Sequence, residues 1–319
     1  NRYQSRQQPS TASSKIENYA FDTTKKALLM NLLILFFLGL CWGLSFTLSK
    51  IAMQAGGTPI GLTFWQSLTA GVLLLGYVYW RHSHFFVPRE IYIPILIISL
   101  LSVVVPNIIF YSAASHLDAG ILSISVSVIP LFTYCIALTL GLDSFKLGRS
   151  IGLLLGFLAL ITLTVPESSL PNKKDIPWVL LSLVCALCYA LENIYIDTLK
   201  LKHFGPIRLV CCISIVSVVL TLPLTLATDQ FFFPKISNPD LLFSALGLGL
   251  IGATAYSVFI FLIGRAGSVF ASQTGYLVTF CGVLWGIILL GESHSIYVWI
   301  SLFLIMAGIF LVQPRETKK

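Results

Sequence analysis

The sequence predicts an all-α polytopic membrane protein with ten transmembrane helices, arranged as two inverted five-helix repeats. Composition is the first observation, because 56% of the 319 residues are hydrophobic and 10% are charged, whereas about a quarter of an average soluble domain is charged. Length is the second, because apolar runs of about 20 residues recur after residue 27, and such a run spans a bilayer as a helix. The third is a pattern of short motifs that occurs once in each half of the chain.

The apolar runs predict helices rather than a barrel. A lipid-exposed segment must satisfy its backbone hydrogen bonds internally, and the runs are long and lack the alternation of barrel strands. We expect spans at residues 28–52, 59–80, 91–115, 119–141, 147–165, 176–199, 206–228, 240–264, 268–291 and 295–313.

The remaining segments predict the domain organisation. Residues 1–27 are polar, rich in Ser, Thr and Gln, and without a signal-peptide apolar core, so we expect a disordered cytoplasmic tail. The other expected units are a first repeat at 28–166, a linker at 167–175, a second repeat at 176–314 and a short tail at 315–319.

The basic residues predict the orientation in the membrane. With the N-terminus inside, most Lys and Arg residues fall in cytoplasmic tails and loops, and the opposite side holds Lys50, Lys173, Lys174 and Lys235. This asymmetry predicts that both termini are cytoplasmic. It also explains the net charge of +7 without nucleic acid as a partner. We expect an integral protein of a bacterial inner (cytoplasmic) membrane.

The internal repeat predicts the inverted architecture. Thr58-Pro59-Ile60-Gly61-Leu62 corresponds to Gly205-Pro206-Ile207-Arg208-Leu209, 147 residues later, and Asp143 corresponds to Glu292 with an offset of 149. Each half then holds five spans. An odd number of crossings inserts the second half upside down, and transporters of this kind bind substrate near the midplane between the halves.

Four sequence features occur in the same order and spacing as in a known family. They are Trp42-Gly43 in the first span, Pro59 at the start of the second, the AGILSISVSVIP run at 119–130 and Gly291-Glu292 at the end of the ninth. Over about residues 28–314 the chain is similar to the drug/metabolite transporter superfamily, specifically its ten-helix EamA-like family. The resemblance implies a secondary transporter for a small polar or amphipathic metabolite, commonly an amino acid or related compound, often exported. The sequence departs from many relatives at Gln66, where they carry arginine.

Glu192 is the most informative single residue. It lies near the middle of the sixth span, where a charged side chain costs at least about 2.5 to 3.5 kcal/mol. We therefore expect it to face a cavity or a partner, as a cation ligand or proton-coupling group. The alternative is a structural hydrogen bond to a neighbouring helix.

Helical spacing places other candidates near Glu192. Tyr189 shares its face, and Trp42 and Ser45 form a comparable stripe in the first span, the repeat equivalent of the sixth. Together with Trp65 these residues could form an aromatic cage for an ammonium group. Ordinary core packing is the alternative.

Further polar residues at mid-depth complete the predicted substrate site. Asn107 and Tyr111 follow Pro106 in the third span, where a proline frees backbone groups that lipid cannot satisfy. The other predicted contacts are Gln66, Tyr256, Gln273 and Tyr276.

Charged residues at helix ends are interpreted as topology signals or gates. Lys50 and Asp197 are repeat equivalents on opposite faces, which suggests a gate hypothesis. The glycines Gly39 and Gly43, four residues apart, predict close helix packing.

The leading functional hypothesis is alternating-access transport of a small-molecule substrate, with protons as a candidate coupling ion. The alternatives are transport of a cationic or quaternary ammonium compound, proton-coupled or facilitative, and a non-transporting membrane receptor. An intramembrane enzyme is disfavoured because HExxH, GxSxG and paired membrane-embedded aspartates are absent. No P-loop is present, so direct ATP coupling within this chain is not supported. The Cys185-x-x-Cys188 pair lies in an apolar run, so we expect neither a metal site nor a cofactor. The lipid bilayer is the other expected partner, and the sequence does not indicate an oligomeric state.

Overall fold

A computed structural model describes residues 11–81, 86–164, 173–199 and 204–311. All regular elements of this part of the chain are helices, joined by turns and loops, which confirms the predicted fold class. The first half begins with α1 (Thr11–Gln54) and α2 (Pro59–Arg81). Its third span consists of η1 (Arg89–Ile91), α3 (Tyr92–Ser99), η2 (Leu100–Val104) and α4 (Val105–Ala114). Its fourth span consists of α5 (Ala119–Ser125) and α6 (Ile129–Thr139), and α7 (Leu147–Thr164) is the fifth. The second half contains η3 (Lys173–Asp175), α8 (Ile176–Leu199), α9 (Pro206–Ala227), α10 (Pro239–Ala266), α11 (Ser268–Ala271), α12 (Thr274–Leu290) and α13 (Ile296–Leu311).

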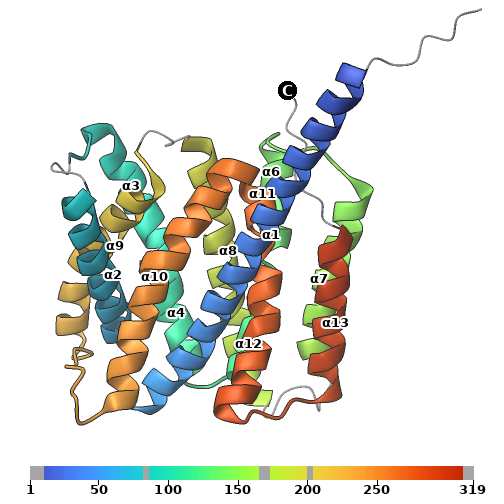
Figure 1. Cartoon of the computed structure of the whole chain (residues 1–319). Helices are drawn as coiled ribbons and strands as arrows, with labels where there is room; N and C mark the ends of the chain where they lie inside the picture. Colours follow the sequence, from blue (N-terminus) through green and yellow to red (C-terminus); the bar gives the residue numbers. More distant parts are fainter. Residues whose placement is uncertain (1–10, 82–85, 165–172, 200–203, 312–319) are drawn as a thin grey trace, which may run out of the picture.

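Eight of these helical stretches, as described, are long and apolar enough to cross a membrane. The two shorter apolar helices, α7 and α13, are the last helix of each half and pack against each other at one edge of the bundle (Figure 1). With them the bundle has the ten predicted spans. Residues 165–172 and 312–319 lie outside the described residues. These ranges include most of the expected linker, the expected ends of both repeats and the expected tail at 315–319.

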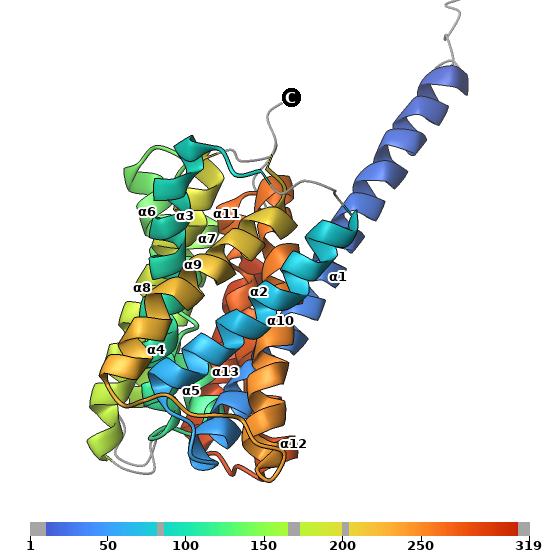
Figure 2. The same ribbon diagram turned by 90° about the vertical axis from the view of Figure 1, so that its left-hand side faces the viewer.

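The first helix is longer than predicted. Although residues 1–27 were expected to form a disordered tail, α1 begins at Thr11 and extends well beyond the bundle (Figure 2). Residues 1–10 lie outside the described part. Once the apolar segment has formed a helix, each added residue gains a hydrogen bond without a new nucleation cost, which favours continuation into the polar segment.

The two halves interlock. In the first half α1 packs against α10 and α12 of the second, and in the second half α8 packs against α4 and against α5 and α6 of the first. The pairs α2–α9 and α7–α13 join equivalent helices directly. This exchange is what a two-fold axis in the membrane plane produces, so the inverted repeat predicted from the sequence is confirmed.

Glycines make the contact between α1 and α12 possible. A Cβ atom on Gly43 would lie 2.6 Å from Cys281 Cβ, and one on Gly39 would lie 2.7 Å from Leu277 Cβ. Real Cβ atoms do not approach that closely. The predicted four-residue glycine pattern therefore supports an interface between the two repeats.

The fourth span is broken after the seven residues of α5 and the ninth after the four residues of α11, although each is expected from the sequence to be continuous. The break at residues 126–128 precedes Pro130, which cannot donate to the carbonyl of Val126. At residues 272–273 there is no proline, but Ser272 Oγ donates to the Val269 carbonyl at 2.9 Å, a local bond that competes with regular helix. In the third span the π-helical turn η2 directly precedes Pro106, which disturbs the helix for the same reason as Pro130.

Candidate functional site

An internal cavity of about 180 Å³ lies where the two halves meet. Its walls come from α1, α2, η2, α4 and α6 of the first half and from α8, α9, α10 and α12 of the second. Eight of the eleven predicted substrate contacts line it: Trp42, Ser45, Gln66, Asn107, Tyr111, Tyr189, Glu192 and Tyr256. That these residues touch substrate remains a prediction.

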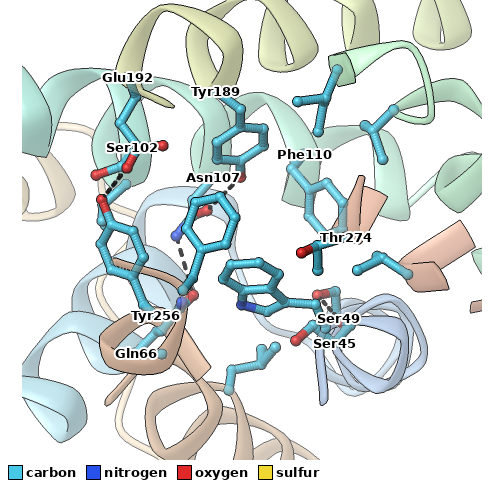
Figure 3. A pocket seen from close by; sticks show the side chains of 18 of the residues that line it. Ser45, Ser49, Gln66, Ser102, Asn107, Phe110, Tyr189, Glu192, Tyr256 and Thr274 are labelled. Carbon is cyan, nitrogen blue, oxygen red and sulfur yellow. Dashed lines mark hydrogen bonds between the residues drawn. The ribbon is translucent and has the colours of Figure 1, made fainter. Parts of the chain in front are cut away.

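Glu192 is the single charged side chain among the described residues that line this cavity. It is 2% exposed, and its Oε1 accepts a hydrogen bond from the Tyr256 hydroxyl (Figure 3). The bond joins α8 to α10, and both helices belong to the second half. One partner does not fill the acceptor capacity of a carboxylate. Glu192 therefore retains capacity to bind a cationic group or a proton.

A network of amide and tyrosine side chains crosses the cavity wall. Gln66 Oε1 accepts from the Tyr111 hydroxyl and from Asn107 Nδ2 at 3.2 Å. The Tyr189 hydroxyl lies 3.5 Å from Asn107 Oδ1 (Figure 3). The network thus connects α2 and α4 to α8 across the repeat interface. Gln66 serves here as an acceptor for two neighbours.

Aromatic rings form the apolar part of the wall. Trp42 and Phe259 meet edge to face with centroids 5.0 Å apart, and Phe46 and Phe110 lie at the same distance. All four residues line the cavity. Such surfaces suit an apolar chain or a cationic group held over a ring face.

Three predicted contacts do not line this cavity. Trp65 Nε1 donates to the Phe232 carbonyl at 2.6 Å, and its ring packs with Phe231 and Phe233. Adjacent helix positions point about 100° apart, so Gln66 faces the cavity while Trp65 faces the loop after α9. Gln273 and Tyr276 are buried, 4% and 1% exposed, but lie outside the cavity lining.

Several lining residues were not predicted as substrate contacts. They are uncharged hydrogen-bonding side chains: Ser49, Ser67, Ser102, Asn193, Ser214, Ser272 and Thr274. Ser49 lies one turn from Ser45, so helical spacing identifies it, whereas Asn193 follows Glu192 directly and helical spacing gives no reason to expect both on one face. Ser272 and Thr274 flank the break in the ninth span, which the apolar sequence does not reveal.

The gate candidate Lys50 lies in an ion-pair cluster at the C-terminal end of α1. Its Nζ pairs with Asp118 and lies 3.3 Å from Glu292 Oε1. Glu292 also accepts from the backbone amides of Ala119 at 2.7 Å and Gly120 at 3.1 Å. The cluster thus connects the end of the ninth span to the start of the fourth.

The surroundings of Glu292 favour its ionised form. Burial alone would raise the pKa of its carboxyl, but the His294 side chain, the amides of Gly120 and Ala119 and the charge of Lys50 together lower that pKa to about 2. Glu292 is therefore an anion at any physiological pH.

Asp197, the other gate candidate, lies at the opposite end of the bundle. Its Oδ2 accepts from the Ser268 amide at 3.2 Å and from Ser268 Oγ at 2.8 Å. Lys50 and Asp197 thus occupy equivalent places, each beside the start of the fourth span of its own repeat. Asp143, the equivalent of Glu292, pairs with Arg149. Their role as gates remains a prediction.

The described residues offer no cluster of three or more His, Cys, Asp or Glu side chains that could hold a metal ion. Cys185 and Cys188 are buried free thiols, and Cys185 Sγ donates to the Pro106 carbonyl at 3.3 Å.

Ten membrane-spanning helices in two inverted halves, with a cavity between them, define the architecture of a secondary transporter. The EamA-like transporter family matches residues 29–165 and 176–313, one match for each half. The chain belongs to this family and thus to the drug/metabolite transporter superfamily.

Individual relatives agree with this assignment. The chain is 27% identical over 286 residues to the uncharacterized inner membrane transporter YedA of Escherichia coli K12, covering 87% of this chain and 89% of YedA. It is 22% identical over 300 residues to the S-adenosylmethionine/S-adenosylhomocysteine transporter of Chlamydia trachomatis serovar L2, covering 91% of each. One solved crystal structure shares the fold with a TM-score of 0.63 at 14% identity, over 87% of this chain and 95% of that chain.

Proposed function

We propose that this protein carries a small polar metabolite, such as an amino acid or related compound, across a bacterial inner membrane by alternating access. The observation that carries the proposal is the cavity at the repeat interface, with one buried carboxylate, an amide and tyrosine network and aromatic walls. A solute held there contacts both halves, so a rocking motion of one half against the other would expose it to either side. The match to inner membrane transporter YedA supports the location.

Protons are the coupling ion that we propose. Among the described residues of the lining Glu192 is the one carboxyl side chain, and its partner Tyr256 belongs to a different helix. Gain or loss of a proton at Glu192 would change the bond between α8 and α10. We expect outward transport, following the family resemblance, with both termini in the cytoplasm.

A cationic substrate is the second candidate. Two observations favour it: Glu192 is not balanced by a Lys or Arg side chain in the described lining, and Trp42, Tyr189 and Tyr256 supply ring faces nearby. The similarity to a transporter named for S-adenosylmethionine, a sulfonium compound, is consistent with this class.

The test begins with a thermal-shift screen of the purified protein against amino acids, amines, quaternary ammonium compounds and nucleobases. A ligand that binds only the folded state raises its apparent stability. Each ligand found is then tested for counterflow in proteoliposomes. Counterflow supports a transporter, whereas binding without flux would support the non-transporting receptor. A pH gradient that drives accumulation in wild type, and none in Glu192→Gln, would support proton coupling.

A further inference from the structure

The N-termini of two half-helices meet at the cavity. α6 begins at Ile129 and α12 at Thr274, and both residues line the cavity together with Gly275. A Cβ atom added to Gly275 would lie 3.7 Å from Pro130 Cδ and 4.0 Å from Ile129 Cβ, so the two helix starts are separated by little more than the space of one methyl group.

This convergence brings two partial positive charges together. Each helix N-terminus carries the positive end of a helix dipole, and the amides of Ile129, Gly275 and Tyr276 donate to carbonyls three residues before them. α6 has 11 residues and α12 has 17, whereas α5 and α11, whose C-terminal ends lie at the same breaks, have 7 and 4. The shorter pieces offset only part of the positive potential. An anionic group placed there would be stabilised.

A buried hydroxyl at the same place lacks a partner. Thr274 is 1% exposed, its Oγ1 makes no hydrogen bond, and it points into the cavity (Figure 3). The Phe270 carbonyl, four residues earlier, accepts from the Gln273 amide at 3.1 Å but receives no bond from Thr274 Oγ1. By contrast, Thr279 on the same helix donates to the Gly275 carbonyl at 2.8 Å. Buried hydroxyls are normally bonded, so Thr274 is free to donate to a ligand.

The acceptor groups lie on the other side of the cavity. Glu192 and Thr274 are at opposite sides of the view, with Asn107 and Tyr189 between them (Figure 3). Asn193, which also lines the cavity, has an unpaired buried Oδ1. One side therefore offers unsatisfied acceptors and a carboxylate, and the other offers a hydroxyl donor and two helix N-termini.

We propose that the start of α12, with Thr274 Oγ1 and the adjoining start of α6, is a subsite for a carboxylate of the transported solute. The cavity then selects elongated zwitterions, in which an ammonium group and a carboxylate are separated by a chain of several carbon atoms. The ammonium binds at Glu192 and Asn193, the chain lies along the aromatic wall, and the carboxylate binds at Thr274. An α-amino acid without a charged side chain has both charges on one carbon, so it reaches one subsite only. This inference rests on the proposed transport function.

The first test is a homologous series of ω-amino acids from glycine to 8-aminooctanoate, with n-alkylamines and n-alkyl carboxylates of matching length. Affinity for the full-length protein, measured by thermal shift and isothermal titration, should peak at an intermediate chain length. At that length the ω-amino acid should bind about tenfold more tightly than the amine, equivalent to about 1.4 kcal/mol. Equal affinity of amine and amino acid at every length, or no binding of any ω-amino acid, would overturn the inference.

The second test uses Thr274→Val, which removes the hydroxyl at nearly constant shape, and Thr274→Ser, which keeps it. We expect Val to weaken ω-amino acid binding several-fold without changing amine binding, and Ser to restore it. Thr254→Val is the matched control, because Thr254 is exposed and its hydroxyl is bonded to the Leu250 carbonyl. An equal loss for amine and amino acid in Thr274→Val would show a structural role and contradict the proposal.

Counterflow measurements distinguish a failure of the carboxylate subsite from a failure of the proposed transport function. Flux of another solute class without any preference for zwitterions would refute the carboxylate subsite and leave the proposed function intact. Absence of flux for every solute that binds would refute the transport function itself. If Thr274→Val does not fold, the chain-length series on wild type decides.

Discussion

Glu192 shows how far one residue can be interpreted from sequence. A carboxylate in the middle of an apolar run already predicts a cavity or a partner, and the structure provides both, the cavity lining and the Tyr256 hydroxyl. The partner's identity could not be predicted, because Tyr256 lies 64 residues away in sequence and approaches only after α10 has packed against α8.

Replacing Glu192 by Gln should separate charge from shape at this position. The amide keeps the size and an acceptor for Tyr256, so we expect the fold to be retained and affinity for ammonium ligands to fall by about 10- to 100-fold, equivalent to about 1.4 to 2.8 kcal/mol. Titration of the best ligand of the screen measures this. Glu90→Gln, at an exposed position outside the cavity, is the control. Unchanged affinity for every cationic ligand would exclude Glu192 as the cation site.

Glu292 predicts a pH dependence of stability. Its folded-state pKa is lowered from 4.5 to about 2, so its ionised form contributes stability above about pH 4.5, and this contribution is lost as pH falls toward 2. We expect the Tm to decrease below about pH 4.5 in wild type. Glu292→Gln should have a lower Tm at neutral pH and a smaller decrease on acidification, as followed by intrinsic fluorescence in detergent. A Tm difference between wild type and Glu292→Gln that stays constant from pH 7 to pH 3 would contradict this assignment.

Three of the residue predictions depended on information that the sequence does not contain. Trp65 and Gln66 are neighbours, and only packing against α9 and α10 decides which of them faces inward. Gln273 and Tyr276 were predicted as hydrogen-bonding groups near mid-depth, but they lie outside the cavity lining, next to the break at 272–273. Helix periodicity gives the relative direction of side chains within one helix, but rotation of the whole helix is a tertiary property.

At the scale of elements, the four-residue spacing of Gly39 and Gly43 predicted close helix packing, and the structure has this packing between α1 and α12. Gly43 allows α1 to approach α12, whereas Gly76 on α2 has nothing within 4 Å of the position of a Cβ atom. Gly43→Ala should therefore lower the Tm, because overpacking costs about 1 to 3 kcal/mol of the free energy of unfolding. Gly76→Ala should leave the Tm unchanged or raise it slightly, because alanine favours helix by about 0.5 to 1 kcal/mol. Thermal unfolding of both variants in the same detergent measures the contrast, and equal Tm values would argue against the tight contact.

The broken spans show the limit of prediction for elements. Pro130 is visible in the sequence and accounts for the first break, but Thr279 occupies the repeat position where a second proline would stand. The second break nevertheless occurs, about one turn earlier, at Ser272 and Gln273. The two interruptions lie at corresponding places of the inverted halves, which is where transporters of this design bind their substrates.

At the scale of the whole molecule, the ends of the bundle are held differently. At the end that contains Lys50, an ion-pair cluster joins the ninth span to the fourth across the repeats. At the other end, Asp197 and Asp143 contact partners within their own repeats. We expect the Lys50 cluster to stabilise the conformation that is closed at that end.

Lys50→Met should therefore shift the population toward a conformation open at the Lys50 end. The measurement uses Ser45→Cys, a cavity-lining position, in a background without the seven native cysteines. Labelling by a membrane-impermeant maleimide, added from the side that contains Lys50, should be several-fold faster with Lys50→Met. Lys235→Met, on the same expected side, is the charge-matched control. An unchanged labelling rate would argue against a gate at Lys50.

The exchange of helices between the halves also bears on how the protein is made. α1 packs against α10 and α12, which are synthesised about 200 residues later. At about 5 to 20 residues per second, the first helix waits roughly 10 to 40 s in the bilayer before its neighbours exist. During this interval its small and polar positions, including Gly43 and Ser45, face lipid or the insertion machinery. Assembly of the bundle is therefore completed only after nearly the whole chain has been translated, and the first half by itself lacks the surfaces that bury α1.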